Sequence, residues 1–339
     1  MTQYDYIKEI AKYGLENDHD RLLDVLNRLI EVSKKSNKTN FAIQLQSILK
    51  DSIKNQQTNG IALVDSPKHI SRENDKILSE LILEKLTSDY RLSDLVCTDN
   101  VHVDLEYFIK EHESLELLNK YELPVSNKIL FHGPSGCGKT LAAYVLAGEL
   151  GKLMLVINLG AIVSSKLGET SKNLAKIFRQ AAAEKAIIFI DEFDSLGKVR
   201  DYSQDHGEMK RVVNTILQLF DYLPQDSIII AATNQLEVID PALSRRFDVQ
   251  IELDKPDEDH IKSLINKTLK TGTFCFDNKR NADSIIKNSV GLSYYTIQRS
   301  LITAIKRSLF NNADNRSISR KINTSIWKDL INQEKNNLK

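Results

Sequence analysis

The sequence predicts an α/β fold in which helices flank a parallel sheet, with further helices before and after it. Three observations predict this class. A glycine-rich turn joins a short apolar run to a helix-favouring segment, apolar runs of strand length alternate with helical segments, and the remaining patterned segments are helical. Continuously apolar runs are typical of buried parallel strands, so we expect a five-stranded parallel sheet. The five runs are at 129–131, 153–159, 186–190, 228–232 and 249–253.

Composition narrows the class of protein. The 339 residues carry 46 Lys and Arg against 46 Asp and Glu, so no overall basic excess points to nucleic acid or an anionic membrane. No apolar run approaches the roughly 20 residues that cross a bilayer, and the first residues lack a signal-peptide core. The three cysteines, Cys97, Cys137 and Cys275, form no metal-ligand spacing. We expect a cytoplasmic protein with reduced thiols.

Helical periodicity dominates the two ends of the chain. Residues 1–56 are predicted to form a small all-α domain, serving either as an adaptor for a partner or as a packing appendage. Residues 57–75 are rich in polar side chains and are predicted to be a linker. Residues 76–255 form the α/β unit with its N-terminal extension, where Ile77, Leu81, Leu83 and Leu86 recur at helical spacing.

After Pro256 the pattern is purely helical. Residues 256–339 are therefore predicted to be a helical lid with a C-terminal helix, whose apolar stripe includes Trp327 and Ile331. The expected helices are at 257–270, 281–289, 296–310 and 322–332.

The glycine-rich turn has the pattern of a phosphate-binding loop. Residues Gly133-Pro134-Ser135-Gly136-Cys137-Gly138-Lys139-Thr140 match G-x-x-x-x-G-K-[ST] without a mismatch, and Leu141 continues into the helix. Backbone N–H groups of such a turn converge on phosphates, and the helix N-terminus favours negative charge. Lys139 is placed to reach the β- and γ-phosphates, and the Thr140 hydroxyl to bind Mg²⁺. The predicted ligands are ATP and Mg²⁺.

Polar residues follow the later strands. Asp191 and Glu192 directly follow the third apolar run. Asp191 is placed to hold Mg²⁺ through water, and Glu192 is placed to polarise an attacking water. Asn234 follows the fourth run and could reach the γ-phosphate or orient that water, or else simply end the strand in a turn. Arg245 and Arg246 follow an Asp240-Pro241-Ala242-Leu243-Ser244 segment. Arg246, with Arg245 as support, is the candidate arginine finger, and the alternative is a pair of surface arginines bound to carboxylates.

Taken in order, these motifs resemble the AAA family of ATPases over roughly residues 94–310. The resemblance implies a five-stranded sheet with a helical lid, and a ring, in this family a hexamer, with ATP between subunits. It also implies that Arg246 enters the neighbouring subunit's site and that Gly291-Leu292-Ser293 of the lid lies near the nucleotide. By this resemblance the chain would hydrolyse ATP to ADP and phosphate and remodel or regulate a protein partner. The alternatives are a nucleotide-gated scaffold for a separately encoded effector, such as a protease, and a DNA-dependent motor or loader.

One position departs from the family. Members that thread polypeptide usually carry an aromatic pore-loop residue, but Lys166 stands there, in Ser164-Ser165-Lys166-Leu167-Gly168-Glu169-Thr170. An aromatic ring intercalates between side chains of an extended chain, whereas lysine is a flexible, hydrated charge. The sequence therefore leaves two interpretations equally open. One is a general unfoldase, and the other is a ring that acts on another substrate or switches a partner without threading it.

Overall fold

A six-stranded sheet lies at the centre of the computed structural model, which describes residues 6, 8–10, 12–13, 19–35, 41–46, 81–157, 169–195, 206–270, 274–311 and 321–337. The strand order is β1-β3-β4-β5-β2-β6. Strands β2 to β6 are parallel, as predicted, and β1 pairs antiparallel with β3 at one edge. The strands are β1 (Ile82–Leu86), β2 (Lys128–His132), β3 (Met154–Ile157), β4 (Ile187–Ile190), β5 (Ile228–Thr233) and β6 (Val249–Glu252).

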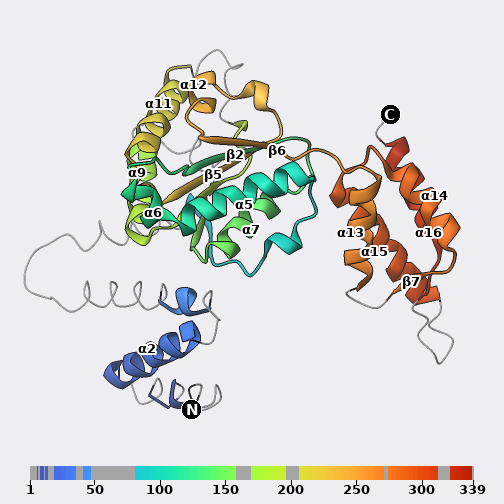
Figure 1. The fold of residues 1–339 in the computed structure, drawn as a ribbon, viewed down its shortest axis with the longest axis horizontal. Coiled ribbons are helices and arrows are strands. Elements are labelled where there is room, and N and C mark those ends of the chain that lie inside the picture. The colour runs from blue at the N-terminus through green and yellow to red at the C-terminus, as the bar shows by residue number, and fades with distance from the viewer. Residues whose placement is uncertain are drawn as a thin grey trace, which may run out of the picture.

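Helices cover both faces of this sheet, and the alternation of side chains along each strand decides what each face packs against (Figure 1). Ile129 and Phe131 of β2 lie in the apolar cluster that includes α5 and α7, whereas Leu130 between them lies in the cluster that includes α9 and α11. These elements are η1 (Leu92–Asp94), α5 (Asp99–Glu113), α6 (Leu115–Lys120), α7 (Lys139–Glu149), α9 (Glu169–Glu184), α11 (His206–Tyr222), η3 (Leu236–Val238) and α12 (Pro241–Ser244).

The predicted C-terminal lid is a group of four helices, orange to red in Figure 1. Trp327 and Ile331 are fully buried in it, as the apolar stripe of the last helix predicted. A two-residue parallel pairing of β7 with β8 accompanies the helices and was not predicted. The elements are α13 (Glu258–Lys270), β7 (Cys275–Phe276), α14 (Lys279–Ser289), α15 (Tyr294–Asn311), β8 (Lys321–Ile322) and α16 (Thr324–Asn336).

The helical prediction around residues 77–86 is wrong for residues 82–86. Residues 82–86 form β1, while Ile77 lies outside the described residues. The spacing of Leu81, Leu83 and Leu86 suits a helix, but the open edge of β3 offers backbone hydrogen bonds that this segment takes. The register shifts between Ile82 and Glu84, which interrupts the two-residue alternation that would have identified a strand.

The N-terminal helices pack on one another. In α2 (His19–Lys35), Val25 and Leu29 are buried with Tyr6, and Leu45 packs against the same cluster. The predicted linker and Lys166 fall outside the described residues. Within the described part of the chain, none of the helices combines the length and apolar character needed to span a membrane.

Candidate functional site

The glycine-rich turn connects β2 to α7, and its glycines adopt backbone angles that other residues rarely reach. Gly133, Gly136 and Gly138 have φ values of 131°, 75° and 96°. A side chain at Gly133 would also overlap the backbone carbonyl oxygen of Leu253, just beyond β6. The turn therefore depends on glycine both for its conformation and for the close approach of a neighbouring strand.

Lys139, the first residue of α7, folds back over the turn. Its side chain is buried, and its Nζ donates hydrogen bonds of 2.8 Å to the carbonyl oxygens of Gly133 and Pro134. Burial lowers the pKa of Lys139. The ammonium group is thus held by weak neutral acceptors at the wall of a cavity, and a phosphate would be a stronger partner.

Thr140 and Asp191 lie side by side at the wall of the same cavity. The Thr140 hydroxyl donates to the Asp191 carboxylate over 2.9 Å. Adjacent hydroxyl and carboxylate oxygens are ligands that suit Mg²⁺, so this pair fits the predicted metal. Glu192 follows with φ 51°, a left-handed conformation that is uncommon outside glycine, and its N–H donates to Asp191 over 2.8 Å. Such strain is concentrated at functional positions in proteins.

Asn234 is placed beside these carboxylates by a buried contact between two strand ends. Thr233 ends β5, and its hydroxyl donates to Asp194 over 3.2 Å. The backbone N–H of Asn234 donates to the same carboxylate over 3.4 Å. Asp194 is only 2% exposed, so it ties the turn after β5 to the turn after β4. The role of Asp194 in joining the two strand ends was not predicted.

One cavity of about 840 Å³ gathers most of the predicted residues. Glu192 and Asn234 line it, as do Lys139, Thr140 and Asp191. From the turn and helix start, Ser135, Gly136, Cys137, Gly138 and Leu141 line it as well. Gly133 and Pro134 are absent from the described lining residues and serve as acceptors for Lys139 instead.

Residues of the lid form one wall of the cavity, and no sequence motif had indicated them. Tyr294, Tyr295 and Lys267 line it, and the backbone N–H of Tyr295 donates to the Gly136 carbonyl oxygen over 3.0 Å. A side chain at Gly136 would crowd the hydroxyl of Ser293, so Ser293 of the lid lies against the turn.

The lid also contacts the segment before α5. Lys267 Nζ donates to the Ser93 carbonyl oxygen over 3.0 Å and forms an ion pair of 3.1 Å with Asp94. Leu95 and Val96, directly after Asp94, line the cavity. Hydrogen bonding to the Arg91 backbone and to Lys267 lowers the pKa of Asp94. Lys267 lies 173 residues after Asp94 in the chain. No local sequence pattern indicated that the two residues would meet.

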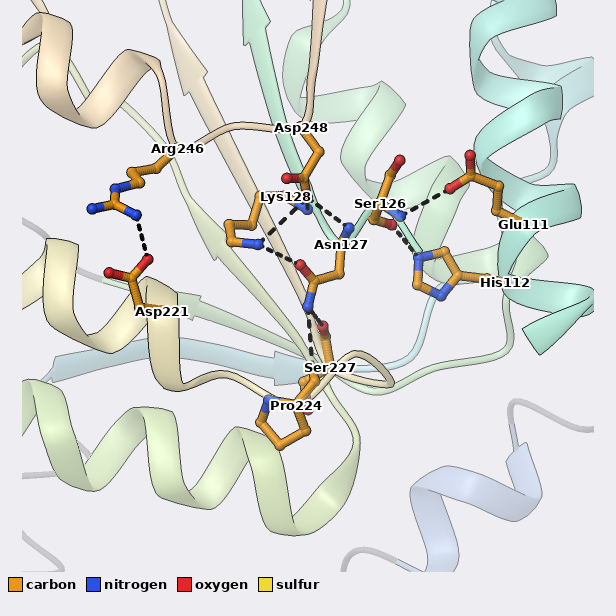
Figure 2. Close-up of polar contacts among 10 residues, drawn as sticks. All are labelled: Glu111, His112, Ser126, Asn127, Lys128, Asp221, Pro224, Ser227, Arg246 and Asp248. Atoms are coloured by element: carbon orange, nitrogen blue, oxygen red, sulfur yellow. Dashed lines mark hydrogen bonds and ion pairs between the residues drawn. The ribbon is translucent and has the colours of Figure 1, made fainter. Parts of the chain in front are cut away.

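Arg245 and Arg246 lie elsewhere, and neither is among the described residues that line the cavity. They follow α12, whose first turn is capped by the Asp240 carboxylate accepting from the Ala242 N–H over 2.8 Å. Arg246 forms an ion pair of 2.8 Å with Asp221 at the end of α11, with both side chains about half exposed (Figure 2). Arg246 thus has a carboxylate partner, as expected if the two arginines are surface residues bound to carboxylates. Its half-exposed side chain also faces solvent, where another molecule can contact it.

Comparison with known proteins agrees with this arrangement. A family model described as "ATPase family associated with various cellular activities (AAA)" matches residues 129–255. An uncharacterized AAA family ATPase from Sinorhizobium fredii is 32% identical over 300 residues, covering 88% of this chain and 87% of that protein. A putative 26S proteasome regulatory subunit homolog from Methanothermobacter marburgensis is 28% identical, covering 71% of this chain and 65% of its own length.

A comparison with solved structures agrees on the fold. The crystal structure of the FIGL-1 AAA domain superposes with a TM-score of 0.62 at 19% sequence identity, covering 80% of this chain and 92% of that one. The extent of the match to the Sinorhizobium protein, together with the family motifs in their expected order, leads to one assignment. The chain belongs to the AAA family of ATPases.

Proposed function

We propose that this protein is a Mg²⁺-dependent ATPase that hydrolyses ATP to ADP and phosphate in a ring of identical subunits, in this family a hexamer. The observation that carries the proposal is the shared cavity. Residues from the ends of three neighbouring parallel strands line it, together with the start of α7 and one face of the lid. Ligand sites of parallel sheets lie at this end of the strands.

The residues of the cavity divide the chemistry among them. Lys139 would exchange its two carbonyl acceptors for the β- and γ-phosphates. Thr140 and Asp191 would hold Mg²⁺, which neutralises phosphate charge when bound. Glu192 would polarise the attacking water, and Asn234 would orient it or contact the γ-phosphate.

The position of Arg246 supports a shared site. A group that stabilises the transition state must lie beside the γ-phosphate, and Arg246 is not among the described residues lining its own cavity. A half-exposed guanidinium that is held by Asp221 alone among the described residues can instead serve the site of an adjacent subunit, with Arg245 in support.

The work coupled to hydrolysis is proposed to be remodelling or regulation of a protein partner in the cytoplasm. The relative from Methanothermobacter carries the name of a proteasome regulatory subunit homolog, which favours a protein partner and keeps open a scaffold that controls a separate protease. The N-terminal helices, which pack on one another, suit a module that presents or holds a partner.

A DNA-dependent motor remains the second candidate because charge is divided unevenly along the chain. Residues 256–339 carry 15 Lys and Arg against eight Asp and Glu, although the whole chain is neutral. A basic lid could bind a phosphate backbone. ATPase stimulation by DNA that disappears at high salt would favour this candidate, and its absence would leave the protein partner.

Three variants of the full-length chain test the ATPase. Lys139→Ala should lose nucleotide affinity, measured with a fluorescent ATP analogue, while Lys120→Ala, at an exposed position of α6, serves as the matched control. Glu192→Gln should keep affinity and lose kcat by about 10²–10⁴-fold, because it removes only the base. Arg246→Ala should lose a factor of about 10³ or more in kcat.

Activity should also depend on assembly. We expect the specific activity of the wild-type protein to rise with protein concentration as rings form, measured beside size by light scattering. Mixing Arg246→Ala with Lys139→Ala should recover turnover, because each supplies what the other lacks. Full activity of Glu192→Gln or of a strictly monomeric protein would contradict the proposed function.

A further inference from the structure

Asn127, the residue before β2, is a buried polar junction between three parts of the chain. Its side-chain Nδ2 donates to the carbonyl oxygens of Pro224 and Ser227, over 3.2 and 3.1 Å. Its Oδ1 accepts from Lys128 Nζ over 2.7 Å. Its backbone carbonyl accepts from the Ile229 N–H over 2.8 Å. Asn127 is only 3% exposed, so these contacts replace water entirely.

Asp248 completes the junction on the side of the turn formed by Arg245 and Arg246, called the arginine turn below (Figure 2). Its Oδ2 accepts from the backbone N–H groups of Asn127 and Lys128, over 2.9 and 3.0 Å. Lys128 Nζ lies 3.4 Å from the same oxygen. Asp248 is two residues beyond Arg246, so its carboxylate fixes the end of the arginine turn to the start of β2.

Phe247, between Arg246 and Asp248, adds an apolar anchor. Phe247 is buried, and its ring meets those of Phe193 and Phe220 edge-on at centroid distances of 5.7 and 5.5 Å. Phe193 follows Glu192, and Phe220 precedes Asp221. The arginine turn is therefore held between a carboxylate junction at the start of β2 and an aromatic cluster that includes Phe193, the residue after Glu192.

The partner of Arg246 is anchored at the same junction. Asp221 lies at the end of α11, and Pro224, three residues later, accepts from the Asn127 side chain. Figure 2 shows Asp221 and Arg246 on one side of this junction and Glu111 and His112 of α5 on the other. Glu111 accepts from the Ser126 N–H over 3.0 Å, which fixes the residue before Asn127.

We propose that Asn127 and Asp248 are positioning residues for the Arg245–Arg246 turn. They join the turn to β2, whose other end carries the phosphate loop, and so link a subunit's own nucleotide site to the arginine it presents to its neighbour. The inference rests on the proposed function, because it concerns an arginine that acts between subunits.

The positioning role differs in its consequences from a general role in stability. Loss of the Asn127 amide leaves the cavity residues Lys139 and Glu192 untouched but releases the loop at Pro224 and, through it, the region of Asp221. Asp248→Ala removes the acceptor for two backbone N–H groups, whereas Asp248→Asn keeps an oxygen in the same place. The conservative variant should therefore retain most of the activity that the alanine variant loses.

The experiment compares Asn127→Ala, Asp248→Ala and Asp248→Asn in the full-length chain, with Asn119→Ala at an exposed site of α6 as the matched control. We expect Asn127→Ala and Asp248→Ala to bind a fluorescent ATP analogue within about twofold of wild type and to form rings. Their kcat should fall by about tenfold or more, with KM unchanged, as for a group used only in the transition state. Asp248→Asn should fall by less than about threefold.

Mixing separates positioning from folding. Asn127→Ala has an intact nucleotide site and a misplaced arginine, so Lys139→Ala subunits should restore its turnover by supplying a well-placed arginine. Arg246→Ala subunits should not restore it, because neither partner supplies one. A poorly folded Asn127→Ala would fail with both partners, and that result overturns the inference.

Two further outcomes are decisive. Wild-type kcat in both Asn127→Ala and Asp248→Ala, while Arg246→Ala is inactive, would overturn the positioning role and leave the proposed function standing. Full activity of Arg246→Ala would instead remove the arginine finger itself, which is a failure of the proposed function.

Discussion

At the scale of single residues, Gly133 carries two requirements at once. Its φ of 131° is unfavourable for any side chain, and a Cβ would overlap the Leu253 carbonyl oxygen. Gly291 in the lid shares only the first requirement, since its φ is 93° and, its two chain neighbours aside, no heavy atom of the described residues lies within 4 Å of a Cβ placed there. The two glycines therefore separate backbone strain from steric overlap.

We expect Gly133→Ala to lower stability by more than Gly291→Ala, whose cost should be about 1–3 kcal/mol from strain alone. Gly133→Ala should also abolish nucleotide binding, because the loop must move away from β6. Thermal unfolding and titration with a fluorescent ATP analogue measure the two effects. Equal losses of stability, with nucleotide affinity retained by Gly133→Ala, would show that the overlap is relieved at no cost.

The residues of the site that the sequence identified are those next to strand ends. Asp191 follows an apolar run directly and Asn234 follows one after a single residue, so sequence position already indicates where they lie in a parallel sheet. Asp221 and Lys267 could not be identified this way, because each acts through a partner far away in the chain. Their helices show apolar periodicity, but this periodicity does not predict which charged side chains on the surface will form an ion pair.

At the scale of elements, β3, β4 and β5 were predictable because each is buried along its whole length, and β2 because its three central apolar residues are buried. β6 was predicted too, although Ile251 is its one buried residue and polar side chains flank it. The edge strand β1 was not predictable, since its residues are half-buried or exposed and its pairing with β3 contains a register shift. The β7–β8 pair has two residues in each strand, too few for any periodicity. Edges and short pairings depend on tertiary contacts that a local pattern does not contain.

The lid helices depend on one large side chain. Trp327 of α16 is fully buried, stacks on Phe276 of β7 at a centroid distance of 5.1 Å, and donates from Nε1 to the Ser300 hydroxyl over 3.2 Å. It thus joins α16, β7 and α15. Because it is the single tryptophan of the chain, its fluorescence reports on the lid.

We expect Trp327→Ala to destabilise the lid by about 3–5 kcal/mol, as for other large buried aromatic residues. Trp327→Phe should cost less, because it keeps a ring against Phe276 and loses only the hydrogen bond to Ser300. Circular dichroism during urea unfolding measures both variants. If the alanine variant unfolds like the wild type, α16 does not hold the lid together.

At the scale of the whole molecule, stability should depend on pH through a buried histidine. His112 of α5 is 7% exposed, and its Nε2 lies 2.9 Å from the Ser126 carbonyl oxygen, which can only accept. Nε2 is therefore the donor, and Nδ1 has no hydrogen-bond partner among the described residues. Protonation would add a second buried donor at Nδ1, for which the described residues provide no acceptor.

Burial lowers the pKa of His112, with Lys152 acting in the same direction, while the Ser126 carbonyl and Glu111 oppose the shift. The unfolded chain, with a histidine pKa of about 6.5, takes up a proton before the folded chain does. Stability from this group is therefore complete above pH 6.5 or so and is lost as pH falls below that value, until the folded pKa is reached. Asp94, Asp226 and Asp257, whose pKa values are lowered, act in a separate window, below about pH 4.

We therefore expect the unfolding free energy of the wild type to fall between about pH 7.5 and about pH 5.5, by at most about 1.4 kcal/mol per pH unit for one proton. His112→Gln can still donate to the Ser126 carbonyl but cannot titrate, so its stability should change less across this range. His102→Gln, at a more exposed position of α5, is the control for loss of a histidine. Urea unfolding at several pH values measures the slopes. An unchanged slope in His112→Gln would mean that another group binds the proton, since removing the buried imidazole must remove its share of the linkage.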